Sequence, residues 1–100
     1  MATLVMPIRV VHLDASDVAL MKLGARGISL AEARQLLRNR HGTERDPRAP
    51  RSEADRLMLI GQTDGGRVLA LVIERTPDPN SWEIVTGWTA SPRERKVLGR

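Results

Sequence analysis

The segment from residue 57 to residue 73 constrains this chain most, because it predicts two apolar strands joined by a glycine-rich turn. Residues 57–62 are rich in β-forming aliphatic side chains, and Asp-Gly-Gly at 64–66 accepts the positive φ of a tight hairpin turn. Residues 68–73 are six aliphatic residues in a row, which is typical of a central strand covered on both faces. A buried helical segment would show the same run, but its short length between a Gly-Gly turn and a proline-rich loop favours a strand.

The length of 100 residues fits a single domain, and we expect residues 1–100 to form one, with 1–7 as an N-terminal tail and 43–55 as a loop. The sequence has no cysteine, which excludes disulfides and thiolate metal sites and fits a reducing cytoplasm. The N-terminal segment lacks the basic region and the apolar run of a signal peptide. No stretch approaches the roughly 18 apolar residues of a membrane span. We therefore expect a cytoplasmic protein without membrane contact.

The charge indicates an anionic partner. Sixteen Lys and Arg stand against 12 acidic residues, a net charge of +4, and nearly all of the basic residues are arginine. Arginine forks suit phosphate, so a nucleic acid or an acidic protein is the expected partner class. A GC-rich coding sequence would give the same excess of arginine, so the net charge alone does not show that the protein binds an anionic partner. Two tryptophans are the only aromatic residues, which argues against a stacking platform for single strands.

The N-terminal half predicts one strand and two helices. Residues 8–12 follow Pro7 and fit an edge strand, and Asp14 or Ser16 would cap a helix that runs to about residue 23. Ser29 and Glu32 form a capping box that starts a second helix, expected to reach about residue 40, with Gly42 just beyond its end. The expected inner side chains of the two helices are Val18, Leu20, Met21, Leu23, Leu30, Ala33, Leu36 and Leu37.

The C-terminal half adds the central hairpin, one more strand and a short helix. Residues 43–54 have no apolar periodicity and predict a loop. After the hairpin, residues 76–81 predict a turn-rich loop and residues 82–87 a strand. Ser91 fits the N-cap of a last helix, with Pro92 at its first position and Glu94 closing a capping box. The order β-α-α-β-β-β-α predicts an α+β fold with an antiparallel sheet of three to four strands, two N-terminal helices and a short C-terminal helix.

Three segments carry a family resemblance. Residues 27–33 (Gly-Ile-Ser-Leu-Ala-Glu-Ala) are similar to the segment HGVSFEEA of BrnT-type toxins, small members of the RelE/ParE-like group in bacterial toxin–antitoxin pairs. Residues 59–72 resemble that family's hairpin, x-I-G-x-T-x-x-G-R-x-L-x-V-V, and residues 84–95 its closing R-I-I-S-A-R-x-A-x-x-x-E-R. The three segments come in the right order and spacing, and the resemblance covers roughly residues 8–98.

The resemblance implies a RelE/ParE-like sheet, cleavage of mRNA on or off the ribosome, and tight inhibition by a small antitoxin that also binds DNA, in a hetero-oligomer. The chain departs from the family at four residues near the expected active face, and its loop at residues 76–81 is longer than the family's usual hairpin connection. Trp88 stands where the family usually has Arg, Ala25-Arg26 where it has Lys-His, and Leu98 where it often has Tyr. These departures leave open a protein-binding module of the same fold that has lost catalysis.

Cleavage of RNA without a metal needs a base, an acid and cations that stabilise the charge developing on the phosphate. Arg67, carried over from the Gly-Arg match, would hold the scissile phosphate with two hydrogen bonds; in the alternative it pairs with Asp64 or a neighbouring strand. Arg93 and Arg95, in the first turns of the last helix, are further catalytic candidates or an ordinary solvated face. Glu94 is a candidate general base or only the capping-box residue.

The remaining candidates concern binding. Lys22, Arg26, Arg67 and Trp88 form the expected RNA-binding set, and Arg26 would stabilise charge but would not act as a base near neutral pH. Trp88 and Arg95 are the expected contacts of the antitoxin.

The other aromatic and histidine residues predict structural roles. Even spacing would put Trp82 and Trp88 on one side of a regular strand, with Trp82 as core cover. His12 and His41 are isolated, so we expect no metal, and no motif predicts a cofactor.

The sequence therefore predicts the toxin of a type II toxin–antitoxin pair, a metal-independent endoribonuclease that acts on mRNA and is inhibited by a cognate antitoxin. The degenerate binding module is the alternative. A small basic nucleic-acid-binding protein outside this family is a third hypothesis.

Overall fold

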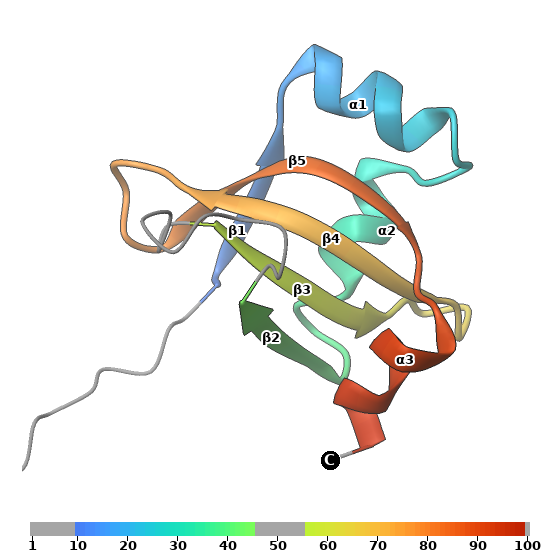
Figure 1. The fold of residues 1–100 in the computed structure, drawn as a ribbon. Coiled ribbons are helices and arrows are strands. Elements are labelled where there is room, and N and C mark those ends of the chain that lie inside the picture. The colour runs from blue at the N-terminus through green and yellow to red at the C-terminus, as the bar shows by residue number, and fades with distance from the viewer. Residues whose placement is uncertain (1–9, 46–55, 100) are drawn as a thin grey trace, which may run out of the picture.

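The computed structural model describes residues 10–45 and 56–99 (Figure 1). The elements are β1 His12–Ala15, α1 Asp17–Gly24, α2 Leu30–Gln35, β2 His41–Arg45, β3 Arg56–Gln62, β4 Val68–Arg75, β5 Ser81–Thr89, α3 Pro92–Arg95 and the 3-10 helix η1 Lys96–Gly99. The expected α+β class is confirmed, with five strands in place of three to four. No helix in the described part of the chain is long and apolar enough to cross a membrane.

The five strands form one mixed sheet in the order β1-β5-β4-β3-β2. Strands β3, β4 and β5 pair antiparallel in sequence order, as predicted. The unexpected β2 also pairs antiparallel with β3, whereas β1 lies parallel to β5. The prediction of a purely antiparallel sheet was therefore wrong. The first strand joins the edge that β5 leaves open and places Leu13 beside Trp82, so that both side chains are buried under the helices.

Strand β2 occupies residues that were expected to form a helix end and a loop. Helix α2 ends at Gln35 instead of residue 40, and Gly42 lies within β2. Gly61 of β3 explains the difference, because a Cβ atom there would lie 2.8 Å from Leu36 Cγ and 2.9 Å from His41 Cβ. The missing side chain lets the chain after α2 lie directly against β3, where pairing replaces further helical turns.

Several predicted segments fall outside the described residues. Residues 1–9, which include the expected tail and the start of the expected first strand, and residues 46–55 of the expected loop are not described. Within the described part, the first strand is His12–Ala15 and the loop at 43–45 is replaced by β2.

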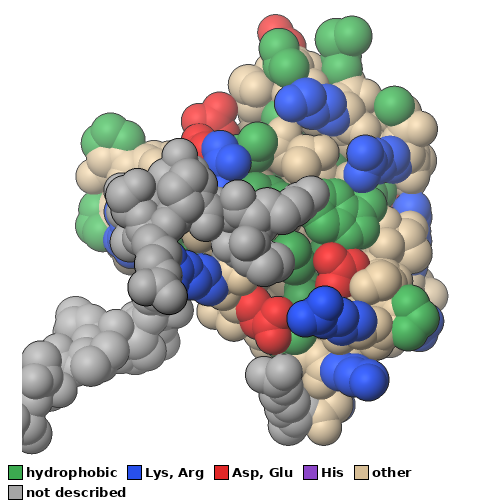
Figure 2. All heavy atoms as spheres, in the orientation of Figure 1, with side chains coloured by type: hydrophobic (Ala, Val, Ile, Leu, Met, Phe, Trp, Pro, Cys, Tyr) green, Lys and Arg blue, Asp and Glu red, His purple; other side chains and the backbone are tan. Residues whose placement is uncertain are grey.

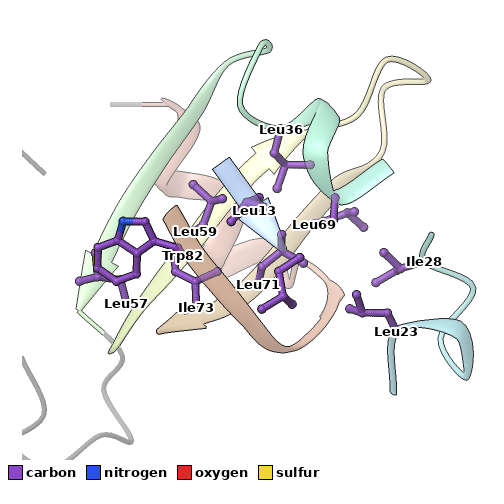
Figure 3. Close-up of a cluster of buried hydrophobic side chains, with 12 residues drawn as sticks. Leu13, Leu23, Ile28, Leu36, Leu57, Leu59, Leu69, Leu71, Ile73 and Trp82 are labelled. Carbon is purple, nitrogen blue, oxygen red and sulfur yellow. The ribbon is translucent and has the colours of Figure 1, made fainter. Parts of the chain in front are cut away.

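The central hairpin is buried on both faces, as predicted. Leucines 57, 59, 69 and 71 with Ile73 pack toward α1 and α2, on what we call the helix face (Figure 3). Met58, Ile60 and Ala70 point the other way and pack with Val97 and Leu98, on the α3 face. This alternation explains why the strand carries an unbroken aliphatic run.

A bulge in β5 separates the two tryptophans. Val72 pairs with Thr86 but Ile73 pairs with Ile84, so Val85 is an extra residue in β5. An extra residue reverses the alternation of side chains beyond it. Trp82 is therefore fully buried on the helix face, which confirms its predicted place in the core, and Trp88 packs on the α3 face. The two lie on one side only in a regular strand, and the irregularity that separates them is at Val85.

The helix starts were predicted better than the helix faces. Ser16 caps α1, and Ser29 with Glu32 and Ser91 with Glu94 form complete capping boxes. In α1, however, only Ala19 and Leu23 are buried, whereas Val18 and Met21 are 63% and 76% exposed. This eight-residue helix lies along β5 at the top of Figure 1, so it buries one narrow stripe.

Some of the side chains that were predicted to face the core from the two helices are exposed in the structure. Val18, Leu20 and Met21 are exposed, Leu23, Ala33 and Leu36 are buried, and Leu30 and Leu37 are partly buried against the core.

Gly87 provides a test of this packing. A Cβ atom at Gly87 would lie 2.5 Å from Leu71 Cδ2 and 3.1 Å from both Leu23 Cδ2 and the Ala70 carbonyl oxygen. Gly87→Ala should therefore lower the free energy of unfolding by about 1–3 kcal/mol, since neither fully buried leucine has room to move. Gly24→Ala is the matched control, because no atom lies within 4 Å of its added Cβ. Urea denaturation measures both, and equal midpoints for the two variants would contradict this packing.

Candidate functional site

Arg67 lies on the helix face, where it holds the connection between α1 and α2 against the sheet. Its Nη1 donates to the Gly27 carbonyl at 2.9 Å and its Nη2 to the Arg26 carbonyl at 3.2 Å. Nε and Nη2 also donate to Thr89 Oγ1, at 3.3 and 3.0 Å. The Glu32 carboxylate lies 3.8 Å from Nη1. All three guanidinium nitrogens thus have protein partners, and we call this set of contacts the Arg67 tie.

A second set of contacts holds the hairpin turn to the end of α2. The Asp64 carboxylate accepts hydrogen bonds from the Arg38 guanidinium and, at 2.9 Å, from Asn39 Nδ2. The Asp64 N–H donates to Gln35 Oε1 at 3.0 Å. Asp64 was one of two alternative partners expected for Arg67. In the structure Asp64 pairs with Arg38, and Arg67 contacts Thr89 of the neighbouring strand β5, which was the other expected partner.

Arg26 reaches from the α1–α2 connection to the edge of β5. Its Nη1 donates to the Gly87 carbonyl at 3.2 Å. The Ala90 N–H donates to Val68, so by the antiparallel alternation the backbone groups of Gly87 point away from β4. Arg26 therefore satisfies a carbonyl on the part of β5 that β1 does not pair. Its guanidinium carbon lies 5.8 Å from the centroid of the Trp88 ring, within the range of a cation–π contact.

Trp88 connects this edge to α3. Its Nε1–H donates to both Glu94 carboxylate oxygens, at 3.0 and 3.2 Å. Glu94 Oε1 also accepts the Ser91 N–H at 2.8 Å, while the Ser91 hydroxyl accepts the Glu94 N–H at 3.2 Å. The capping carboxylate thus holds the indole as well, and it links the start of α3 to β5.

A hollow of about 560 Å³ lies next to Glu94 on the α3 face. Its lining is mostly charged and consists of Glu44, Arg45, Met58, Ser91, Arg93, Glu94 and Lys96. Figure 2 shows charged side chains gathered around apolar ones on this face of the molecule. We use the name α3 surface for Arg26, Trp88, Arg93, Glu94, Arg95 and Lys96.

The structure brings together most of the residues predicted from sequence. Arg26, Trp88 and Glu94 are in direct contact, and Arg93 and Arg95 are exposed on the same helix as Glu94. Arg67 lies on the opposite face of the sheet and is linked to this group through its hydrogen bonds to the Arg26 carbonyl and to Thr89, the residue after Trp88. Lys22 lies apart on α1, where it lines a separate groove with Glu74 and Glu83.

Two cations of the hollow were not predicted. Arg45 was missed because β2 was not expected, so nothing placed residue 45 near α3. Lys96 directly follows Arg93-Glu-Arg95, and that run of charges could have indicated it. His12 and His41 are exposed, each at the start of a strand. Within residues 10–45 and 56–99, no three His, Cys, Asp or Glu side chains are placed to hold one metal ion.

Comparison of the sequence with protein-family models and with curated proteins gives no match. The proposal for function therefore depends on the resemblance of the three segments and on the geometry described above.

The Asp64 contacts predict a pH dependence. The hydrogen bond from Arg38, with that from Asn39, holds the pKa of the Asp64 carboxyl below its ordinary value. A carboxyl whose pKa is lowered on folding stabilises the fold above its unfolded pKa, and this contribution is lost as pH falls through the folded pKa. Arg38→Gln should therefore raise the Asp64 pKa toward the ordinary value, measured by NMR titration of the side-chain carboxyl. Arg40→Gln is the control, and an Asp64 pKa unmoved by Arg38→Gln would contradict the pairing.

Proposed function

We propose that the protein is a BrnT-like toxin of a type II toxin–antitoxin pair and that it acts on RNA through the α3 surface. One observation carries the proposal. Arg26, Trp88 and Glu94 come from the α1–α2 connection, β5 and α3, and they fall beside or within two of the three segments that resemble the toxin family, although Arg26 and Trp88 differ from the family's usual residues. In the structure they form one continuous set of contacts next to Arg93 and the hollow.

The charges of the α3 surface suit a phosphate backbone. Arg93, Arg95 and Lys96 are exposed on consecutive turns at the C-terminal end of the chain, and Arg45 faces the same hollow. Arginine binds phosphate through two parallel hydrogen bonds, whereas lysine acts as a point charge. In this proposal Arg93 and Arg95 hold the RNA backbone, and Arg26 adds a further cation beside the Trp88 ring.

Cleavage in this proposal uses cations and no metal. The 2′-hydroxyl of the RNA gives its proton to water and attacks the adjacent phosphorus, while the bond from phosphorus to the 5′-oxygen breaks and that oxygen takes a proton from water. Arg93 and Arg95 stabilise the negative charge that develops on the phosphate oxygens. Arg67 is a positioning residue rather than a phosphate ligand, because its donors are used by Gly27, Arg26 and Thr89. The cognate antitoxin would cover Trp88 and Arg95 and so block access to the RNA. A RelE/ParE-like fold and a cytoplasmic location belong to the same proposal.

The protein-binding module without catalysis is the second candidate, and one observation favours it. Both oxygens of Glu94 accept hydrogen bonds from Trp88, and one of them also accepts the Ser91 N–H. The carboxylate therefore serves the fold, and neither histidine contributes to the lining of the hollow as far as the structure describes it. In this candidate the α3 surface docks an acidic partner protein and no RNA is cleaved.

Inducible expression in a bacterium, with mapping of RNA ends, distinguishes the two candidates. We expect growth arrest and new RNA ends, and a loss of cleavage of about 100-fold in the double variant Arg93→Gln, Arg95→Gln, because removing a group that stabilises transition-state charge has an effect of this size. Arg40→Gln, which removes an exposed arginine outside the α3 surface, should cleave like the parent protein.

Circular dichroism of each purified variant confirms that it is folded. Normal growth with intact RNA from the folded parent protein would contradict the toxin proposal and support the binding module.

A further inference from the structure

Within residues 10–45 and 56–99, β3 and β4 pair on both sides, and the free edges of β1 and β5 each have a backbone carbonyl that accepts a hydrogen bond from an arginine. At the outer edge of β1, Arg34 of α2 satisfies one backbone group: its Nε donates to the Leu13 carbonyl at 2.9 Å, and its Nη2 contacts Asp14 Oδ1 at 3.0 Å. The open part of β5 is covered by α1 and by the hydrogen bond from Arg26 to Gly87. Covering of this kind prevents an edge from pairing with other chains.

Strand β2 is the exception. The Gln62 N–H donates to the Arg40 carbonyl, so by the antiparallel alternation residues 40, 42 and 44 face β3. His41, Thr43 and Arg45 therefore direct their backbone N–H and C=O groups away from the sheet. No strand within residues 10–45 and 56–99 lies along this edge, which is the last in the strand order. The side chains of His41, Thr43 and Arg45 are also exposed.

Packing on the α3 face holds β2 extended without covering this edge. A Cβ atom at Gly42 would lie 2.9 Å from Val97 Cγ1, so η1 packs closely on the backbone of β2. On the helix face, Leu36 and the start of β2 meet Gly61 of β3. The strand is thus fixed from both faces, and its outward backbone groups are already arranged for pairing.

The charges near this edge select the occupant. Arg45 ends β2 and lines the hollow together with Arg93 and Lys96. The two carboxylates of the same lining, Glu44 and Glu94, both have partners already. A strand laid along β2 would run past these three cations, so acidic side chains on it would be favoured. A second copy of this chain is less suited, because antiparallel pairing of two β2 strands about Thr43 puts Arg45 opposite His41 and gives it no carboxylate.

We propose that the outer edge of β2 accepts an extended, acidic segment of a partner protein, which adds a sixth strand to the sheet. Backbone hydrogen bonds to His41, Thr43 and Arg45 give the affinity, and carboxylates near Arg45, Arg93 and Lys96 give the specificity. The inference rests on the proposed function only in naming the antitoxin as the source of this segment.

The test uses the full chain and a capped synthetic peptide of seven residues in which glutamate alternates with valine or threonine. We expect NMR titration to shift the amide signals of His41, Thr43 and Arg45 and to slow their hydrogen exchange. Thr43→Pro removes one outward N–H, and proline is tolerated on an edge strand when its nitrogen faces solvent. This variant should bind the peptide at least tenfold more weakly, whereas the control Thr43→Val, which keeps the N–H, should bind within about twofold of the parent.

The proposal would be overturned by equal binding of Thr43→Pro and Thr43→Val, by equal binding of a peptide with lysine in place of glutamate, or by self-association of the chain through β2 in sedimentation. Absence of any peptide binding would count against it in the same way. Peptide binding is measured without RNA, and RNA cleavage is measured separately in the expression experiment described above. If the peptide binds but the expression experiment shows no cleavage, the toxin activity is rejected and the edge-strand inference stands.

Discussion

The half-buried guanidinium of Arg67 is the interaction on which the rest of this structure depends. It stands directly before β4 and donates to carbonyls of the α1–α2 connection and to Thr89 of β5. It therefore joins two strands of the sheet to the helical layer at one point. Hydrogen bonds from an ionised donor are roughly twice as strong as neutral ones, and a forked side chain can satisfy several acceptors at fixed angles. Lysine at this position could not reproduce that geometry.

The α3 surface follows from this tie. Because Arg67 fixes the carbonyl of Arg26, the Arg26 side chain can extend around the edge of β5 to Gly87 and the Trp88 ring. Trp88 in turn holds Glu94 and so the start of α3, which carries Arg93 and Arg95. A residue on the helix face thus influences cations on the opposite face. This arrangement explains how Arg67 can matter for function although its own donors are occupied.

Local chemistry made part of the fold predictable. The Gly-rich turn, the capping serines and the aliphatic runs act over a few residues, and the hairpin and all three helix starts followed from them. Strand β2 was missed because its formation depends on a missing side chain at Gly61, about twenty residues away. The parallel β1 and the bulge at Val85 also depend on pairing between distant strands. For the same reason the sequence-based prediction placed Arg67 and Trp88 in one RNA-binding set, although the sheet lies between their side chains.

The most direct test of the account compares the ring-proton NMR signals of Trp88 in the parent protein and in Arg67→Met. The account predicts that loss of the tie frees the Arg26 segment, so that the Trp88 signals shift while those of the buried Trp82 stay in place. Arg38→Gln, which removes only the contact to Asp64, should leave Trp88 unchanged. A folded Arg67→Met protein with unmoved Trp88 signals would contradict the claim that Arg67 positions the α3 surface.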